Sequence, residues 1–185
     1  MTKRPKLSQK PGKALARIVV RSAPRDQRRA ILQAGPLVMP AAIGRSGRTS
    51  RKREGDGATP IASMPLLFAF YRGDRLSRPL TSLRVHPIRA DMLWCDAEGH
   101  ANYNRPVRAP SSPSHERLQR EDELYDLCIV MDWNLRMRKR RCGSAIFFHL
   151  ARPGFTPTEG CVAIRRRDMS RLLPHLGRHT ILQVL

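Results

Sequence analysis

Two apolar runs near the C-terminus, Gly143-Ser-Ala-Ile-Phe-Phe-His149 and Cys161-Val-Ala-Ile164, decide how this chain is interpreted. The first run has the composition of a strand and ends on a histidine. The residues between the two runs predict a loop, because they include Pro153, Gly154 and Pro157. The pattern therefore predicts two strands joined by a loop, with a histidine at the end of one and a cysteine at the start of the next.

Cys161 and His149 are the candidate catalytic residues. A cysteine attacks a carbonyl as its thiolate, and a nearby imidazole can accept the thiol proton. Gly160 lets the backbone approach a substrate carbonyl without a side chain in the way. The amides of Gly160 and Cys161 are candidate donors for an oxyanion hole. The alternative is a structural cysteine and a core histidine, because one Cys and one His are a weak motif by themselves.

Short β-branched and apolar runs recur along the chain and predict a mostly β domain built from hairpins. One helix is predicted at residues 167–176, with Asp168 as its N-cap and Gly177 as its stop signal. The predicted strands cover residues 16–21, 29–33, 37–44, 64–71, 124–132, 144–149, 161–164 and 181–185.

Candidate substrate-binding residues come from the loops. Residues 72–113 are mostly irregular and polar, and we expect them to shape a cleft. Asn104 and Arg105 are candidates to line it, and Arg152 is a candidate to bind a substrate carboxylate. The alternative for all three is an ordinary loop position. Thr158 either bonds substrate or stabilises the turn before Gly160.

The composition limits the classes of function. Lys and Arg number 35 against 15 Asp and Glu, which gives a formal net charge of +20. Such a field attracts polyanions, including nucleic acid, anionic membranes and acidic cell-wall polymers. Aromatic residues are only 5% of the chain, so stacking platforms for single-stranded nucleic acid are scarce. Because nucleic-acid-binding motifs are also lacking, we expect no specific nucleic-acid partner.

The length suits one domain, residues 14–185, which we expect to be a monomer. Residues 1–13 are basic and contain two prolines, and they predict a flexible tail. No apolar run reaches the ~18 residues of a membrane span, and the basic N-terminus lacks the apolar segment of a signal peptide. The four cysteines form no Cys-x-x-Cys pair, so no metal site is predicted.

His149 followed by Thr158-Glu-Gly-Cys161 resembles the active-site segment of the L,D-transpeptidase catalytic domain, the YkuD-like family. The pattern of that family is His, a loop of variable length, and Ser/Thr-any-Gly-Cys. Residues 52–60 resemble its glycine-bearing turn before Thr-Pro, and residues 125–134 resemble the strand upstream of the histidine. The resemblance runs from about residue 14 to residue 185. It implies a β-sandwich with a C-terminal helix and with the cysteine at the edge of a cleft.

Three positions depart from the usual pattern of the family. Leu150 stands where glycine usually follows the histidine, and Glu159 stands where histidine often precedes the Gly-Cys step. Ala163 occupies the place of an arginine that commonly helps to hold substrate. The departures indicate a divergent branch that retains the nucleophile and the base.

The resemblance implies a cysteine-dependent acyltransferase of peptidoglycan stem peptides. A donor peptide would form a thioester on Cys161, and its acyl group would pass to an amine of a neighbouring stem peptide or, in a carboxypeptidase reaction, to water. No cofactor is implied, and the family implies a periplasmic or cell-wall location. Two alternatives stay open: a non-catalytic basic domain that binds anionic cell-wall polymer, and a thiol amidohydrolase with another substrate.

Overall fold

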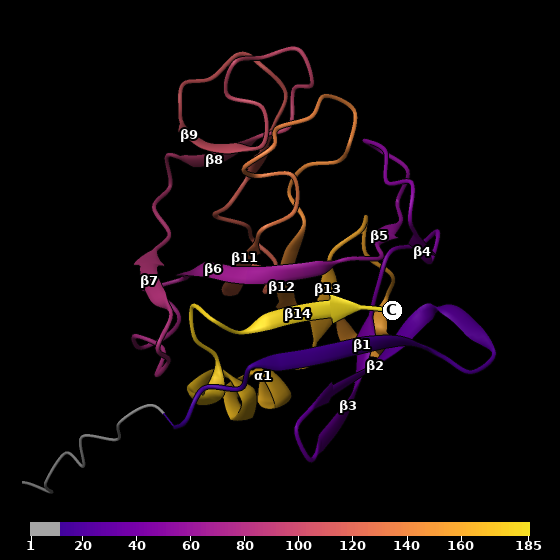
Figure 1. Ribbon diagram of the computed structural model, residues 1–185. Helices are drawn as coiled ribbons and strands as arrows, with labels where there is room; N and C mark the ends of the chain where they lie inside the picture. The colour runs from indigo at the N-terminus through magenta and orange to yellow at the C-terminus, as the bar shows by residue number, and fades with distance from the viewer. Residues whose placement is uncertain (1–11) are drawn as a thin grey trace, which may run out of the picture.

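A computed structural model describes residues 12–185 of the chain (Figure 1). The predicted flexible tail, residues 1–13, lies almost wholly outside the described residues. The prediction of a mostly β domain with one C-terminal helix is confirmed. The strands are β1 (Arg17–Ala23), β2 (Asp26–Ala34), β3 (Leu37–Ala42), β4 (Arg48–Thr49), β5 (Thr59–Pro60), β6 (Ser63–Tyr71), β7 (Arg84–Pro87), β8 (Met92–Cys95), β9 (Arg105–Arg108), β10 (His115–Arg117), β11 (Leu127–Met131), β12 (Phe147–Leu150), β13 (Val162–Ile164) and β14 (Ile181–Val184).

The main sheet has nine strands in the order β11-β12-β13-β3-β2-β1-β14-β6-β7. It closes on itself at β6, because residues 66–71 of β6 pair with β11 while residues 63–65 pair with β14. β7 pairs with β6 outside this ring. In Figure 1, β1, β14 and β6 lie nearest the viewer, with β11 and β12 behind them. The two layers of the predicted sandwich are therefore joined along one side.

Alternate side chains of the strands fill the inside of the closed sheet. Ile18 and Val20 of β1 point into this core, and Ile129 and Met131 of β11 meet them there, all four fully buried. Each such side chain stabilises the fold by about 1.5–3 kcal/mol through removal of apolar surface from water. Because successive side chains of a strand point to opposite faces of the sheet, the intervening side chains of β11 lie on the outer face.

The C-terminal helix α1 (Arg166–Leu172) continues into a short 3-10 turn, η2 (Leu173–His175). Its apolar side contributes Met169 and Leu172 to the main core. The predicted N-cap is wrong. Arg165 occupies the N-cap without a side-chain bond, and Asp168 lies in the first turn. The carboxylate of Asp168 still faces the positive end of the helix dipole, so the residue type suits a helix start although the boundary differs.

Residues 72–113 are more regular than predicted. They contain β7, β8 and β9, and β8 pairs with both β9 and β10 in a separate three-stranded sheet. Trp94 of β8 is fully buried, and its ring meets the edge of Phe147 with centroids 4.9 Å apart. These strands are only four residues long, too short for an alternating pattern to stand out in the sequence. The small sheet is thereby held over the outer face of β11 and β12.

The backbone passes very close to two other segments at Gly44, just after β3. The Gly44 N–H donates to Thr59 Oγ1 at 2.8 Å. On the other side, the Thr158 N–H donates to the Ile43 carbonyl at 2.9 Å, and the Arg45 N–H donates to the Thr158 carbonyl at 2.8 Å. A Cβ atom on Gly44 would lie 2.3 Å from the Gly57 carbonyl oxygen. Only glycine therefore fits at this crossing.

Replacing Gly44 by alanine should destabilise the protein by about 1–3 kcal/mol or more, because the added methyl group collides with backbone that cannot rotate away. Urea unfolding measures the change. Gly99→Ala is the matched control, since a Cβ at Gly99 meets nothing within 4 Å. Equal unfolding midpoints for the two variants would contradict the close crossing.

Candidate active site

The outer face of β12 and β13 presents both candidate catalytic residues. Phe148 and Leu150 of β12 point into the main core, so the intervening His149 points outward. In the parallel ladder, Phe148 pairs with Val162 and His149 pairs with Ala163. Cys161 precedes this ladder by one residue and therefore lies beside Phe147. The alternation predicted for two apolar strands thus brings the thiol and the imidazole to one face.

A cavity of about 510 Å³ lies over this face, below the small sheet. Cys161, His149 and Ala163 line it from the main sheet. The small sheet and the loops complete the wall with both acidic and basic side chains. The lining includes Glu54, Asp96, His115, Glu116, Arg120, Tyr125, Ser144, Ala145, Arg152, Thr158 and Glu159. Four of the residues predicted from sequence, Cys161, His149, Arg152 and Thr158, therefore share one cavity.

The Cys161 thiol is buried and neutral in this structure. Its S–H donates to the Ala145 carbonyl at 3.2 Å, and the Phe147 N–H donates to the sulfur at 3.3 Å. Burial raises the pKa of the thiol to about 12, although the bond from Phe147 opposes this rise. The backbone N–H directed at the sulfur would stabilise the thiolate once a base removes the proton.

His149 is held as a neutral base. Its Nδ1–H donates to the Leu150 carbonyl oxygen at 2.8 Å, and a carbonyl can only accept. This bond places the proton on Nδ1 and leaves the lone pair on Nε2 available. Burial lowers the pKa of the imidazole to about 4. The group that orients the histidine is therefore a backbone carbonyl.

The turn before Cys161 is fixed by hydroxyl groups. Thr158 Oγ1 donates to the Cys161 carbonyl at 2.7 Å and accepts the Gly160 N–H at 3.2 Å. Thr59 Oγ1 also donates to the Cys161 carbonyl, at 3.4 Å. A Cβ on Gly160 would lie 2.9 Å from the Ala58 carbonyl oxygen. The Thr158 hydroxyl and the Gly160 amide are both engaged within the turn, which favours the turn-stabilising alternative for Thr158.

Asn104 and Arg105 are not among the described residues that line the cavity. Asn104 is 1% exposed. Its Oδ1 accepts the Trp94 indole N–H at 3.0 Å and the Ala145 N–H at 3.1 Å, and its amide donates to the Trp133 carbonyl. The prediction that Asn104 faces the cleft is wrong because these bonds turn its amide inward. Asn104 does not contact Cys161 itself but positions Ala145, whose carbonyl accepts the hydrogen bond of the thiol. Arg105 belongs to β9, on the far side of β8 from β10.

Arg152 lines the cavity with its side chain half exposed. It lies 3.4 Å from Asp122, a long contact. Arg120 forms closer bonds to the same carboxylate, with its Nε donating at 2.8 Å. Arg152 is therefore the less constrained of the two guanidinium groups at this end of the cavity.

The sequence pattern does not single out Tyr125, Glu116 or Asp96, which the fold adds to the site. The Tyr125 hydroxyl donates to Glu116 Oε1 at 2.7 Å, and its ring meets the imidazole of His149 with centroids 5.3 Å apart. Burial raises the pKa of Glu116. These residues come from the small sheet and the loop after it, so only tertiary structure unites them. The one signal for Tyr125 is its place in the segment that resembles the family.

The three departures from the family pattern have separate structural settings. Leu150 is 3% exposed and fills the main core. Glu159 lies on the rim, where it pairs with Arg45 at 2.8 Å. Ala163 lies beside His149 and lines the cavity, so no long side chain covers the imidazole from β13. Arg165, Arg166 and Arg167 are not among the described cavity-lining residues and do not replace the missing arginine there.

Within residues 12–185, no group of three or more His, Cys, Asp or Glu side chains is arranged to hold a metal ion.

Lowering the pH from 7 to 5 should destabilise the fold through His149. Its pKa is about 6.5 in an unfolded chain and about 4 in the folded protein. Between these values the unfolded state binds more protons, so the free energy of unfolding falls as the pH falls. The loss by pH 5 is about 2 kcal/mol.

Urea unfolding at both pH values measures this loss. His149→Asn should lose about 2 kcal/mol less than the wild type between pH 7 and 5. His179→Asn, at an exposed position, should behave as the wild type does. The same pH dependence in wild type and His149→Asn would contradict a histidine kept neutral by burial.

Comparison with known proteins identifies the family of this chain. The L,D-transpeptidase catalytic domain family, YkuD, matches residues 16–184. A search of curated proteins gives no match. The solved structure of Bdellovibrio bacteriovorus Bd1075 is similar over 91% of this chain and 47% of the solved chain, with 16% identity and a TM-score of 0.42. This chain thus spans about half the length of that protein. Because the family match covers nearly the whole chain, the protein belongs to the L,D-transpeptidase catalytic domain family.

Proposed function

We propose that this chain is a cysteine-dependent L,D-transpeptidase that acts on peptidoglycan stem peptides through a thioester on Cys161. The observation that carries the proposal is the position of Cys161 and His149 in one cavity of a domain of this family. The tautomer of His149 supports the assignment, because the bond of Nδ1 to Leu150 leaves Nε2 as the proton acceptor.

In the first half-reaction, His149 Nε2 accepts the thiol proton and the sulfur of Cys161 attacks the carbonyl carbon of the donor peptide bond. The C–S bond forms and the C–N bond breaks, and the imidazolium gives its proton to the departing amine of D-alanine. The thiol proton must first turn away from the Ala145 carbonyl, its acceptor in the resting site. Neutral thiol and neutral imidazole avoid an uncompensated buried charge before substrate arrives.

In the second half-reaction, an amine of the acceptor peptide attacks the thioester carbon. His149 accepts a proton from the attacking nitrogen, the C–N bond forms, and the C–S bond breaks. The proton then returns to the sulfur, which restores the resting pair. Water in place of the amine makes the same site a carboxypeptidase.

Arg152 is our candidate to hold a substrate carboxylate, because its side chain lines the cavity and its contact with Asp122 is long. Thr158 contributes by holding the Cys161 carbonyl. The Gly160 amide donates to Thr158 at rest, so an oxyanion role for it requires that this 3.2 Å bond open. The Cys161 amide is the second oxyanion candidate.

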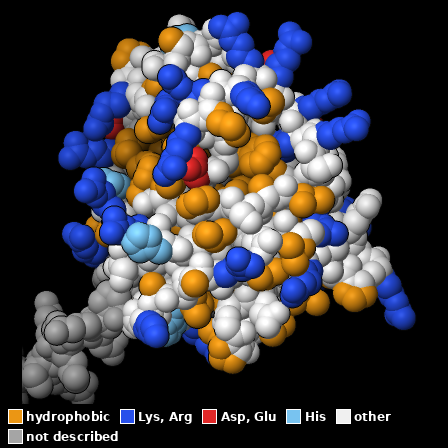
Figure 2. Space-filling model, in the orientation of Figure 1, with side chains coloured by type: hydrophobic (Ala, Val, Ile, Leu, Met, Phe, Trp, Pro, Cys, Tyr) orange, Lys and Arg blue, Asp and Glu red, His pale blue; other side chains and the backbone are white. Residues whose placement is uncertain are grey.

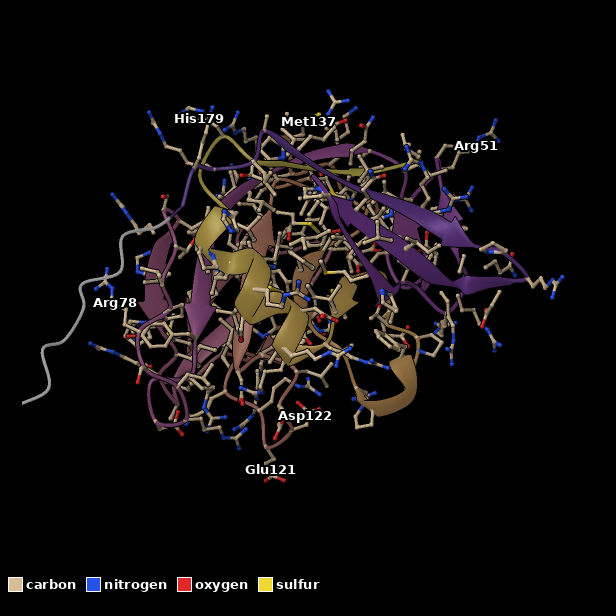
Figure 3. All side chains as sticks on the ribbon, turned by 90° about the horizontal axis from the view of Figure 1, so that it is seen from below. Arg51, Arg78, Glu121, Asp122, Met137 and His179 are labelled. Carbon is tan, nitrogen blue, oxygen red and sulfur yellow. The ribbon has the colours of Figure 1, made fainter. Side chains whose placement is uncertain are left out.

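A basic loop beside the small sheet is our candidate for docking to anionic cell-wall polymer. Residues 136–141 are all exposed, and five of them are Lys or Arg. The side chains of Arg136 and Arg141 are 79% and 85% exposed, so their ion pairs to Asp132 and Glu98 leave most of each guanidinium in solvent. Figure 2 shows Lys and Arg gathered on the upper part of the face, over the small sheet and this loop. Figure 3 shows Met137 of the loop at the opposite edge from Glu121 and Asp122.

Docking to cell-wall polymer would place the protein in the periplasm or at the cell wall. None of the helices in residues 12–185 is long and apolar enough to span a membrane.

Intact-mass analysis after incubation with a stem tetrapeptide, and separately with a carbapenem, tests the nucleophile. We expect the wild type to gain a covalent adduct on Cys161 and to release D-alanine from the tetrapeptide. Cys161→Ala should form no adduct. His149→Ala should form it about 10²–10⁴-fold more slowly, because a positioned general base has gone.

Cys128→Ala is the matched control, since Cys128 is fully buried on the same outer face and should not be needed for the adduct. An adduct that persists in Cys161→Ala would overturn the assignment. Hydrolysis of other amides without any reaction on stem peptides would favour a thiol amidohydrolase. Polymer binding without an adduct under any condition would favour the non-catalytic basic domain.

Salt should weaken docking far more than chemistry. The Debye length falls from about 10 Å at 0.1 M to about 3 Å at 1 M ionic strength, which screens long-range attraction to anionic sacculi. Turnover of a small soluble peptide should change much less. Sedimentation with sacculi and peptide turnover across one salt series measure both.

The location of the charge matters as well as its amount. Neutralising Arg138, Lys139 and Arg140 to glutamine should weaken sacculus binding more than the same change at Arg167, Arg171 and Arg178, which are exposed at or just after α1. Equal losses for the two triple variants would mean that net charge, and not this loop, determines docking.

A further inference from the structure

The cavity has the opposite charge character from the rest of the protein. The chain carries a formal net charge of +20. The cavity wall nevertheless contains four carboxylates, Glu54, Asp96, Glu116 and Glu159, against the guanidinium groups of Arg120 and Arg152. In so basic a protein, a cavity with more acidic than basic groups points to a cationic ligand.

The charges within the cavity are not distributed evenly. Arg120 and Arg152 both contact Asp122, and Glu159 pairs with Arg45 on the rim. Glu116 Oε1 accepts the Tyr125 hydroxyl at 2.7 Å and lies 3.5 Å from Arg120. Glu54 accepts the hydroxyl of Tyr103. Asp96 differs from these groups, because its Oδ1 is buried and has no hydrogen-bond partner in the part of the chain that the structure describes.

Asp96, the residue just after β8, and Glu116 of β10 face the cavity from the small sheet. Glu116 pairs with Trp94 in the β8–β10 ladder, and Asp96 is two residues beyond Trp94 on the same face. The Asp96 N–H donates to the Ser114 carbonyl, which continues the ladder to this position. Diagonal neighbours of this kind are close enough for both carboxylates to contact one small group.

Ser144 supplies a second buried polar atom in this cavity. It lines the same cavity and is 7% exposed. The Tyr103 hydroxyl lies nearby, but no described residue meets the Ser144 Oγ with hydrogen-bond geometry. Ser144 immediately precedes Ala145, whose carbonyl accepts the Cys161 thiol. A buried polar atom without a partner destabilises a fold, so two of them in one cavity call for a functional explanation.

We infer that Asp96, Glu116 and Ser144 form a subsite for a primary ammonium group, the amine of the acyl acceptor. An ammonium has three N–H donors and no acceptor, which suits two carboxylates and one hydroxyl oxygen. This inference rests on the proposed function for its role. The subsite binds the acceptor as its ammonium close to the thioester. A carboxylate of the subsite accepts the first proton, which frees the nitrogen lone pair. His149 accepts the second proton as the nitrogen attacks and passes it to the departing sulfur.

The test separates capture of the amine from formation of the thioester. Asp96→Asn should lower the second-order rate of aminolysis by glycinamide at least about tenfold, because a charge-assisted bond is lost. The rate of acylation by the donor tetrapeptide, and the rate of thioester hydrolysis without amine, should fall much less than the rate of aminolysis. The ratio of aminolysis to hydrolysis products, measured by mass spectrometry, reports the difference.

Glu98→Gln is the matched control. It removes a carboxylate two residues from Asp96, but Glu98 pairs with Arg141 and is not among the described cavity-lining residues. If Asp96→Asn and Glu98→Gln give the same ratio of aminolysis to hydrolysis products, the proposed subsite is wrong. Failure of the wild type to form any thioester would instead count against the proposed function.

Binding without chemistry gives a second readout. In Cys161→Ala protein, titration with 1,5-diaminopentane followed by NMR should show saturable binding, weakened at least about tenfold by Asp96→Asn and less by Ser144→Ala. If Asp96→Asn fails to fold, Glu116→Gln in the same background carries the test. Equal affinity in all these variants would overturn the inference.

Discussion

The close crossing of backbone at Gly44 is the constraint on which the active site depends. The segment after β3 lies between the turn that carries Cys161 and the Gly57–Thr59 segment, and a Cβ on Gly44 would lie 2.3 Å from the Gly57 carbonyl oxygen. The crossing allows Thr59 to accept the Gly44 N–H and to contact the Cys161 carbonyl at 3.4 Å. Hydrogen bonds on both sides of this segment, and a contact at Gly44 too close for any other residue, therefore determine where Cys161 lies. The closed sheet provides the rigid support on which this turn rests.

The electrostatics of the site follow from the same packing. Desolvation keeps the Cys161 thiol and the His149 imidazole neutral at rest, since it raises the pKa of one to about 12 and lowers that of the other to about 4. A pair of this kind differs from a preformed thiolate–imidazolium pair, which needs an environment that stabilises both charges. Here the Phe147 N–H is the group directed at the sulfur, and its contribution grows as the proton leaves. In the proposed reaction, proton transfer from Cys161 to His149 therefore follows substrate binding rather than preceding it.

Much of the fold and part of the site could be predicted from the sequence. The rest could not, for physical reasons. The apolar runs of β12 and β13 fix which side chains face outward, so Cys161 and His149 emerge together from a local pattern. The small sheet could not be predicted, because β8 and β9 are four residues each and their stability comes from Trp94 packing on Phe147. For the same reason the sequence does not reveal that Asn104 is buried, since its side chain bonds to Trp94, Trp133 and Ala145, which only the fold brings together. Glu116 and Asp96 reach the cavity only through that sheet.

The departures from the family pattern leave the setting of His149 intact and change the charge of the cavity. Leu150 replaces a glycine with a core side chain and leaves the backbone carbonyl that orients His149 in place. Ala163 removes a cationic side chain from the strand beside His149, while Asp96 and Glu116 present carboxylates from the opposite wall. Both features make the electrostatic potential in the cavity more negative: the absence of an arginine at position 163, and the carboxylates of Asp96 and Glu116 on the opposite wall. A cavity altered in this way favours an amine-bearing ligand over a carboxylate at that position, whereas Arg152 keeps a basic group at the other end.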